Sequence, residues 1–125
     1  MIEILKDYPD DVLAVTGKGR VTAEDYREVL IPEANRRIEK YGTIRLFCHL
    51  GADFDGLTAG AAWSDLKLGI SRWNQIGRMV VVTDVTWIRD AVYLFAPIFH
   101  HPVRTFANKD LEAARAWILE REVAA

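Results

Sequence analysis

The chain has 125 residues, of which half are hydrophobic and 27% are charged, and its formal net charge is −2. A chain of this length can bury a core without a disulfide or a metal, and its single cysteine excludes an internal disulfide framework. The charge balance excludes a strongly basic nucleic-acid-binding protein. We therefore expect one domain over residues 1–125, in the reducing cytoplasm, with no nucleic-acid partner.

The first third of the chain predicts a hairpin followed by a helix. Apolar residues at 2–5 and 12–16 flank a turn signal, which favours two antiparallel strands. Thr22 is placed to cap the next helix, with an aspartate three residues later as its reciprocal partner. Pro32 lies inside the helical pattern and should kink or split it, and Gly42 should end it.

From residue 44 onward, strand patterns alternate with helix patterns. We expect strands at 44–50, 79–83 and 102–106, and helices at 59–73, 86–99 and 108–122. Residues 51–58 are expected to form a loop, and Thr86 and Asn108 to cap the last two helices. Such alternation implies parallel pairing with right-handed crossovers. The prediction is an α/β fold with four helices and a five-stranded mixed sheet, antiparallel in its N-terminal hairpin and mostly parallel elsewhere.

The segment from Asp53 to Thr58 reads Asp-Phe-Asp-Gly-Leu-Thr and resembles the first motif of haloacid-dehalogenase-type phosphatases. In that family the first aspartate attacks phosphorus and the second handles the proton. Here two residues separate Asp53 from the strand end, and no paired acidic motif for magnesium follows. As a calcium loop, the segment lacks the fifth-position oxygen ligand and the final glutamate. A polar turn in which Asp55 and Thr58 satisfy backbone groups is therefore the favoured interpretation.

Other pairs of reactive residues give no catalytic or metal site. Cys48 and His49 are neighbours on a strand, so their side chains point to opposite faces and cannot form a dyad. Cys48 is expected in the core. His100 and His101 have no acidic or cysteine partner nearby in sequence, which favours a surface position. We expect no enzymatic activity, no metal and no cofactor.

The expected helix at 86–99 is apolar nearly all round after its first turn, although a helix on a sheet usually buries one stripe. Some of its aromatic residues must therefore meet another helix, a partner chain, a ligand or a membrane surface. The expected helix at 59–73 also has surplus apolar residues, so the two helices could enclose a pocket. The candidate ligand-binding residues are Trp63, Leu66, Trp87, Tyr93, Phe95 and Phe99.

Four segments carry a resemblance to a known family, namely 17–22, 41–47, 52–63 and 78–84. On these segments the chain resembles the SpoIIAA-like family, relatives of the STAS domains of sulfate transporters and anti-sigma-factor antagonists. The resemblance implies a mixed five-stranded sheet with helices packed on it and no catalytic machinery. True anti-sigma antagonists carry a phosphorylatable serine at the start of the second helix, and here Thr58 stands in that region instead.

Members of the SpoIIAA-like branch are regarded as binders of small apolar ligands, with mobile helices and some membrane association. The resemblance therefore implies a non-enzymatic cytoplasmic domain that binds an apolar small molecule or lipid, with reversible peripheral membrane contact. The alternative is a STAS-type regulatory protein-interaction module that lacks the standard serine, with Thr58 as its candidate regulatory residue. Four tryptophans and an apolar helix also predict a symmetric homodimer.

Overall fold

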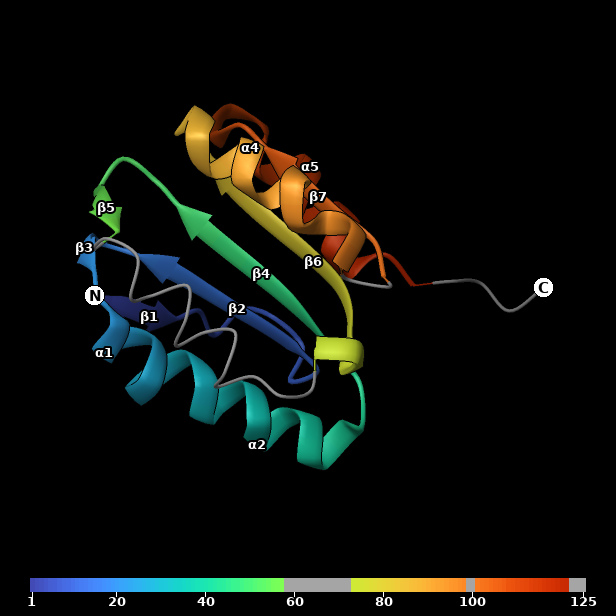
Figure 1. Ribbon diagram of the computed structural model, residues 1–125. Helices are drawn as coiled ribbons and strands as arrows, with labels where there is room; N and C mark the ends of the chain where they lie inside the picture. The colour runs from blue at the N-terminus through green and yellow to red at the C-terminus, as the bar shows by residue number, and fades with distance from the viewer. Residues whose placement is uncertain (58–72, 99–100, 122–125) are drawn as a thin grey trace.

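A computed structural model describes residues 1–57, 73–98 and 101–121. Within these ranges, five strands form one sheet in the spatial order β1-β2-β4-β6-β7 (Figure 1). They are β1 (Ile2–Ile4), β2 (Val12–Gly17), β4 (Ile44–Leu50), β6 (Ile76–Thr83) and β7 (Val103–Phe106). Strand β1 pairs antiparallel with β2, and the other three pairings are parallel. The predicted mixed sheet with an N-terminal antiparallel hairpin is confirmed.

Helices pack on both faces of this sheet. Helix α2 (Ile31–Tyr41) and helix α4 (Thr86–Phe95) lie on the face that carries Val15, Cys48 and Val81, which are register partners on three adjacent strands. Helix α5 (Leu111–Leu119) covers the opposite face. The sheet is therefore buried on both sides, which is why its central strands read as nearly continuous apolar runs.

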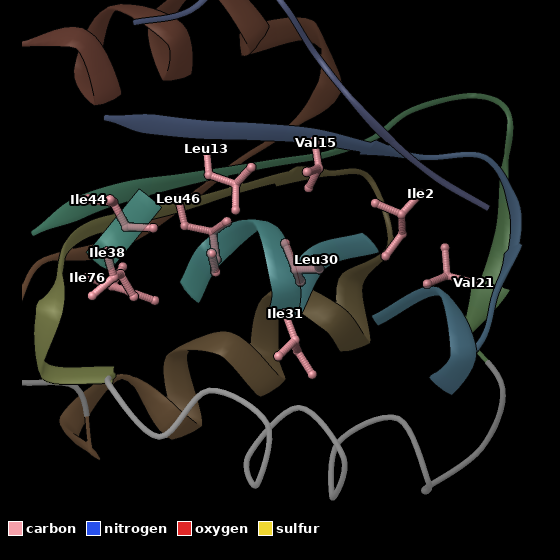
Figure 2. Packing of buried hydrophobic residues seen from close by; sticks show 11 residues of the cluster. Ile2, Leu13, Val15, Val21, Leu30, Ile31, Ile38, Ile44, Leu46 and Ile76 are labelled. Atoms are coloured by element: carbon pink, nitrogen blue, oxygen red, sulfur yellow. The ribbon is translucent and has the colours of Figure 1, made fainter. Parts of the chain in front are cut away.

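The core between α2 and the sheet is built from aliphatic side chains. Figure 2 shows Leu30, just before α2, and Ile38, within it, facing the strands that carry Leu13 and Leu46. Leu30, Ala34 and Ile38 recur at steps of four, so one face of this helical segment is apolar.

The first helix begins with a reciprocal pair of hydrogen bonds. The Thr22 N–H donates to Asp25 Oδ2 at 2.8 Å, and the Asp25 N–H donates to Thr22 Oγ1 at 3.2 Å. This is the capping box that the sequence predicts, with aspartate in place of the usual glutamate. It starts the short helix α1 (Ala23–Asp25).

Pro32 splits the predicted helix, as expected. A π-helical turn, η1 (Tyr26–Leu30), precedes α2, and the Ile31 N–H donates to the carbonyl of Tyr26, five residues earlier. Proline has no N–H, and its ring would clash with the carbonyl four residues before it, so the wider turn relieves a conflict that a regular α-helix cannot. Gly42 ends α2 with a φ of 78°, and its N–H donates to the Ile38 carbonyl at 2.7 Å.

A small second sheet corrects the prediction of a loop at 51–58. Strand β3 (Gly19–Val21) pairs in parallel with β5 (Phe54–Leu57), and the Gly19 N–H donates to the Asp53 carbonyl at 2.6 Å. Both strands are short and contain a glycine, so they lack the alternation of apolar and polar residues by which strands are recognised. Their pairing depends on the main sheet, which brings two distant segments together.

The predicted caps of the last two helices are wrong. Val85 is the N-cap of α4. Its N–H donates to the hydroxyl of Thr83 at 3.1 Å, and not to that of Thr86. Asn108 opens a 3₁₀ turn, η4 (Asn108–Asp110), without a side-chain cap. The α-helix itself starts three residues later than predicted, because this tighter turn leads into it.

Helix α4 ends at Phe95 rather than near Phe99, and a 3₁₀ turn, η3 (Ala96–Ile98), follows it. Pro97 explains the early end, since it cannot donate to the carbonyl of Tyr93. Within the described residues, helical segments stand at three of the four expected places. The expected helix at 59–73 lies outside the described residues except for Trp73, which begins a 3₁₀ turn, η2 (Trp73–Gln75).

Candidate functional site

Helix α4 packs on the sheet through one buried stripe of side chains. Ile88 and Val92, one turn apart, are buried with Leu50 and Val81 in a cluster of their own. The buried Thr83 hydroxyl fixes the entry of the chain into the helix through its bond to the next segment. The inner face of α4 is therefore formed by Ile88 and Val92, which pack with Leu50 at the end of β4 and Val81 in β6.

The outer face of α4 carries large apolar side chains in contact with solvent. Leu94 is 77% exposed and Trp87 is 53% exposed. These two residues are seven positions apart, which places them on the same side of the helix and away from the buried stripe. We call Trp87 and Leu94 the α4 outer face. Exposed apolar residues are common singly, but a tryptophan and a leucine two turns apart on the same side of one short helix form a surface suited to binding.

Tyr93 belongs to another side of α4. Its hydroxyl accepts the N–H of Thr105 at 3.3 Å, although the residue is 53% exposed. Strand β7 ends the spatial order of the sheet, so this bond satisfies a backbone donor at a sheet edge. Tyr93 thus links α4 to the edge strand β7.

Most of the predicted binding residues fall outside the described residues. Trp63 and Leu66 lie in 58–72, as does the candidate regulatory residue Thr58, and Phe99 lies in 99–100. Phe95 ends α4, but its side chain also lies outside the described part. Among the six, the structure places the side chains of Trp87 and Tyr93, and it turns them to different sides of the helix.

The reactive residues weighed in the sequence lie as follows. Asp53 and Asp55 are exposed on and beside β5. Cys48 packs in the core under α2 and α4, where burial raises the pKa of its thiol to about 12, and His49 lies on the other face of the sheet. The prediction that Cys48 and His49 point apart is confirmed. Across the described ranges, no group of three or more metal-binding side chains comes together.

Polar groups that the sequence did not connect meet at the carboxyl ends of the strands. The Asn108 N–H donates to Asp84 Oδ1 at 2.9 Å, while the side-chain Oδ1 of Asn108 is buried without a hydrogen-bond partner among the described residues. Burial lowers the pKa of the nearby His49. The Thr16 hydroxyl donates to the His49 carbonyl at 3.0 Å. These residues come from four separate segments, so no local sequence pattern predicts that they lie close together.

A pocket lies at the opposite, amino-terminal ends of the strands. It measures about 370 Å³, and its lining includes Arg45, Arg78, Arg121, His101 and Asp11. We call it the arginine pocket. No sequence motif points to these arginines. The available signal was weak, namely an arginine near the start of each of two strands that are largely apolar.

Comparison with known proteins agrees with this architecture. A family model described as SpoIIAA-like matches residues 12–119. The chain is similar in fold to the crystal structure of an uncharacterized protein of the DUF3478 family with a SpoIIAA-like fold, from Shewanella loihica PV-4. The TM-score is 0.71, the sequence identity is 25%, and the match covers 94% of this chain and 93% of the other. No curated protein matches the chain.

Among the described helices, none is long and apolar enough to span a lipid bilayer. The family match extends from the second strand of the main sheet to the last residue of α5, and so includes α4 and both central strands. It therefore covers nearly all of the fold on which the α4 outer face and the arginine pocket are built. The chain belongs to the SpoIIAA-like family.

Proposed function

We propose that this SpoIIAA-like domain is a non-enzymatic binding module for a small apolar ligand or a lipid, with reversible contact to a membrane surface. Its family and fold support a regulatory or interaction module. The single observation that carries the finer proposal is the α4 outer face, where Trp87 and Leu94 meet solvent. The same proposal takes Trp63, Leu66, Tyr93, Phe95 and Phe99 as further ligand contacts.

The size of this surface sets the strength of binding that it supports. Full burial of a leucine or a comparable side chain contributes about 1.5–3 kcal/mol, and the two residues together supply a few kcal/mol before the cost of association. Tryptophan also prefers the boundary between water and lipid. The charged residues of α4 are one arginine and one aspartate, so anionic lipid gains little electrostatic attraction. Binding should therefore be weak, reversible and insensitive to lipid charge.

The test is flotation with vesicles of neutral phosphatidylcholine. The wild-type protein should be recovered in the lipid fraction, and the Trp87→Ser, Leu94→Ser double variant should not. Tyr41→Ser is the matched control, because Tyr41 is also a large exposed side chain but lies at the end of α2. Equal recovery of the double variant and the wild type would remove the role of the α4 outer face.

A protein partner is the alternative occupant of the same surface, as expected for a STAS-type interaction module. Native mass spectrometry of the protein as purified separates the two functions. A mass increased by a bound apolar compound supports ligand binding. A mass equal to that of the chain without a bound compound, together with a stoichiometric protein partner that the double variant fails to capture, supports the interaction module.

A further inference from the structure

The arginine pocket is a separate feature, at the end of the sheet where β4 and β6 begin. Arg45 comes from β4, Arg78 from β6, and Arg121 from the chain just beyond α5. Asp11, Thr43 and His101 complete its polar lining. A volume of about 370 Å³ falls within the range of sites for small molecules. The charges and hydrogen-bond donors of this lining determine which class of ligand the pocket can recognise.

Two of the arginines are held in place by the end of α5. Arg45 and Arg78 are register partners on adjacent parallel strands, so their side chains leave the same face side by side. Arg45 Nη1 donates to the Ile118 carbonyl at 2.8 Å and also to the carbonyl of Glu120. Arg78 Nη1 donates to the Trp117 carbonyl at 2.9 Å, and its guanidinium lies 4.9 Å from the centre of the Trp117 ring. Both guanidinium groups are therefore positioned before any ligand arrives.

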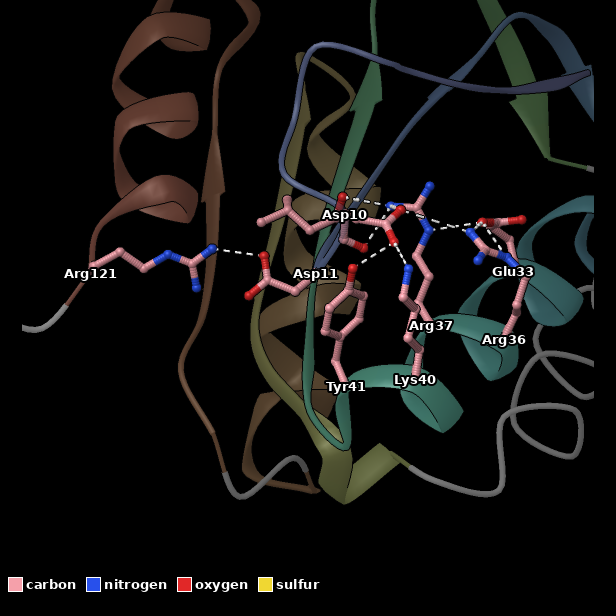
Figure 3. A network of polar contacts seen from close by, with 9 residues as sticks. Asp10, Asp11, Glu33, Arg36, Arg37, Lys40, Tyr41 and Arg121 are labelled. Atoms are coloured by element: carbon pink, nitrogen blue, oxygen red, sulfur yellow. Dashed lines mark hydrogen bonds and ion pairs between the residues drawn. The ribbon is translucent and has the colours of Figure 1, made fainter.

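The positive charge of the pocket is only partly neutralised. Arg121 donates to Asp11 Oδ1 at 2.8 Å (Figure 3), and Arg78 forms an ion pair with Glu120 at 3.3 Å. Among the residues that the structure describes, three guanidinium groups thus face two carboxylates, which leaves an excess of positive charge. The pKa of Arg45 is lowered by burial and then by the charges of Arg121 and Arg78, ahead of the opposing effects of Asp11 and Glu120. An anion in the pocket would relieve this repulsion.

Arg45 and Arg121 also have N–H groups that make no hydrogen bond among the described residues. Within the described residues, the hydrogen bonds of Arg45 run through Nη1 alone and those of Arg121 through Nη2 alone. A guanidinium has further N–H groups that suit the oxygens of carboxylates and phosphates. Here the three guanidinium groups come from three separate segments of the chain. A tetrahedral phosphate offers oxygens in several directions, whereas a carboxylate offers two in one plane.

We propose that the arginine pocket binds the phosphate group of a small, water-soluble molecule. Arg45 and Arg78 form its fixed wall, and Arg121 closes over the anion by exchanging part of its contact with Asp11. The site lies apart from the α4 outer face, so it does not depend on the function proposed above.

The test is a nuclear magnetic resonance titration of ¹⁵N-labelled protein with inorganic phosphate, at constant ionic strength balanced with sodium chloride. Phosphate should cause saturable shifts in the backbone amides of residues 43–45, 77–78 and 121 and in the arginine Nε–Hε signals. Arg121→Gln should weaken binding about tenfold, the loss expected for a charge-assisted hydrogen bond to the anion. Arg20→Gln is the matched control, because Arg20 is exposed on β3 and does not line this pocket, and it should leave the affinity unchanged.

Two more variants keep the proposal falsifiable if Arg121→Gln disturbs the fold. Asp11→Asn removes the carboxylate that competes for Arg121 and should tighten phosphate binding. Arg45→Lys retains the charge but loses the planar fork, and should weaken it. Shifts no larger than those caused by chloride would overturn the proposal. So would an unchanged affinity in both arginine variants, or acetate binding as tightly as phosphate.

Discussion

Arg37 shows how a single buried cation joins two parts of the molecule. It is 8% exposed, and its Nη1 donates to the carbonyls of Asp10 and Val12 at 3.1 and 3.0 Å, while its Nε donates to Glu33 Oε1 at 2.8 Å (Figure 3). The guanidinium therefore ties α2 to the connection between β1 and β2. A buried charge is tolerated only when it is paired and hydrogen-bonded, and Glu33 supplies the pairing charge.

Removal of that charge should destabilise the protein. Glu33→Gln removes the carboxylate that is hydrogen-bonded to Arg37 and leaves only Asp10, whose Oδ1 lies 3.9 Å from Arg37 Nη1, as a counter-charge. We expect a loss of about 2 kcal/mol in the free energy of unfolding at neutral pH. Urea denaturation followed by circular dichroism measures this loss. Glu24→Gln, an exposed change on α1, is the control and should have little effect. A Glu33→Gln protein as stable as the wild type would show that the pair contributes nothing.

The same pair predicts a dependence of stability on pH. Hydrogen bonds from Arg36 and then Arg37 lower the pKa of Glu33 below its ordinary value of 4.5. A lowered carboxyl pKa stabilises the folded state above the unfolded pKa, and the contribution is lost as pH falls through the folded pKa. The stability difference between wild type and Glu33→Gln should therefore be constant above about pH 5 and shrink below pH 4. A difference that grew on acidification would contradict this assignment.

At the scale of elements, the structure separates two threonines that look alike in the sequence. Thr22 and Thr86 both precede helices, but Thr22 exchanges hydrogen bonds with Asp25, whereas Thr86 is the exposed first residue of α4, and the N-cap of that helix makes no side-chain bond. Thr22→Ala should lower the free energy of unfolding by about 1 kcal/mol, and Thr86→Ala should change it by less than about 0.5 kcal/mol. Thermal and urea unfolding of the two variants in parallel measure the contrast. Equal losses would mean that Thr86 has a role the structure does not show.

At the scale of the whole molecule, the α4 outer face is an apolar surface that contacts solvent. Two-fold pairing is the commonest way for a small protein to bury such a surface, so we predict a symmetric homodimer that competes with ligand or lipid for the α4 outer face. Light scattering at micromolar concentrations should report twice the mass of the chain for the wild type. The Leu94→Ser protein should be a monomer, because Leu94 is the most exposed of the large hydrophobic side chains that the structure describes on α4. A wild-type monomer would leave the surface to ligand or lipid.

The pattern of residues along the chain determined the main sheet. The apolar runs at 12–16, 44–50 and 79–83 are each long enough to specify a buried strand, and the helical patterns between them impose parallel pairing. Pro32 and Gly42 also act through their own backbone chemistry, so a split helix and its end could be located before any contact was known. These features depend on residues close in sequence, which is why they were predictable.

Tertiary structure decided the features that join distant residues. An almost uniformly apolar helix has no strong stripe of its own, so only its place on the sheet selects Ile88 and Val92 as the inner face and leaves Trp87 outside. The pairing of β3 with β5 required the main sheet to bring both segments together. The arginine pocket required the register of Arg45 with Arg78 and the return of the chain beyond α5. Parallel crossovers place such residues side by side from positions far apart in sequence, and local patterning has no means to record that proximity.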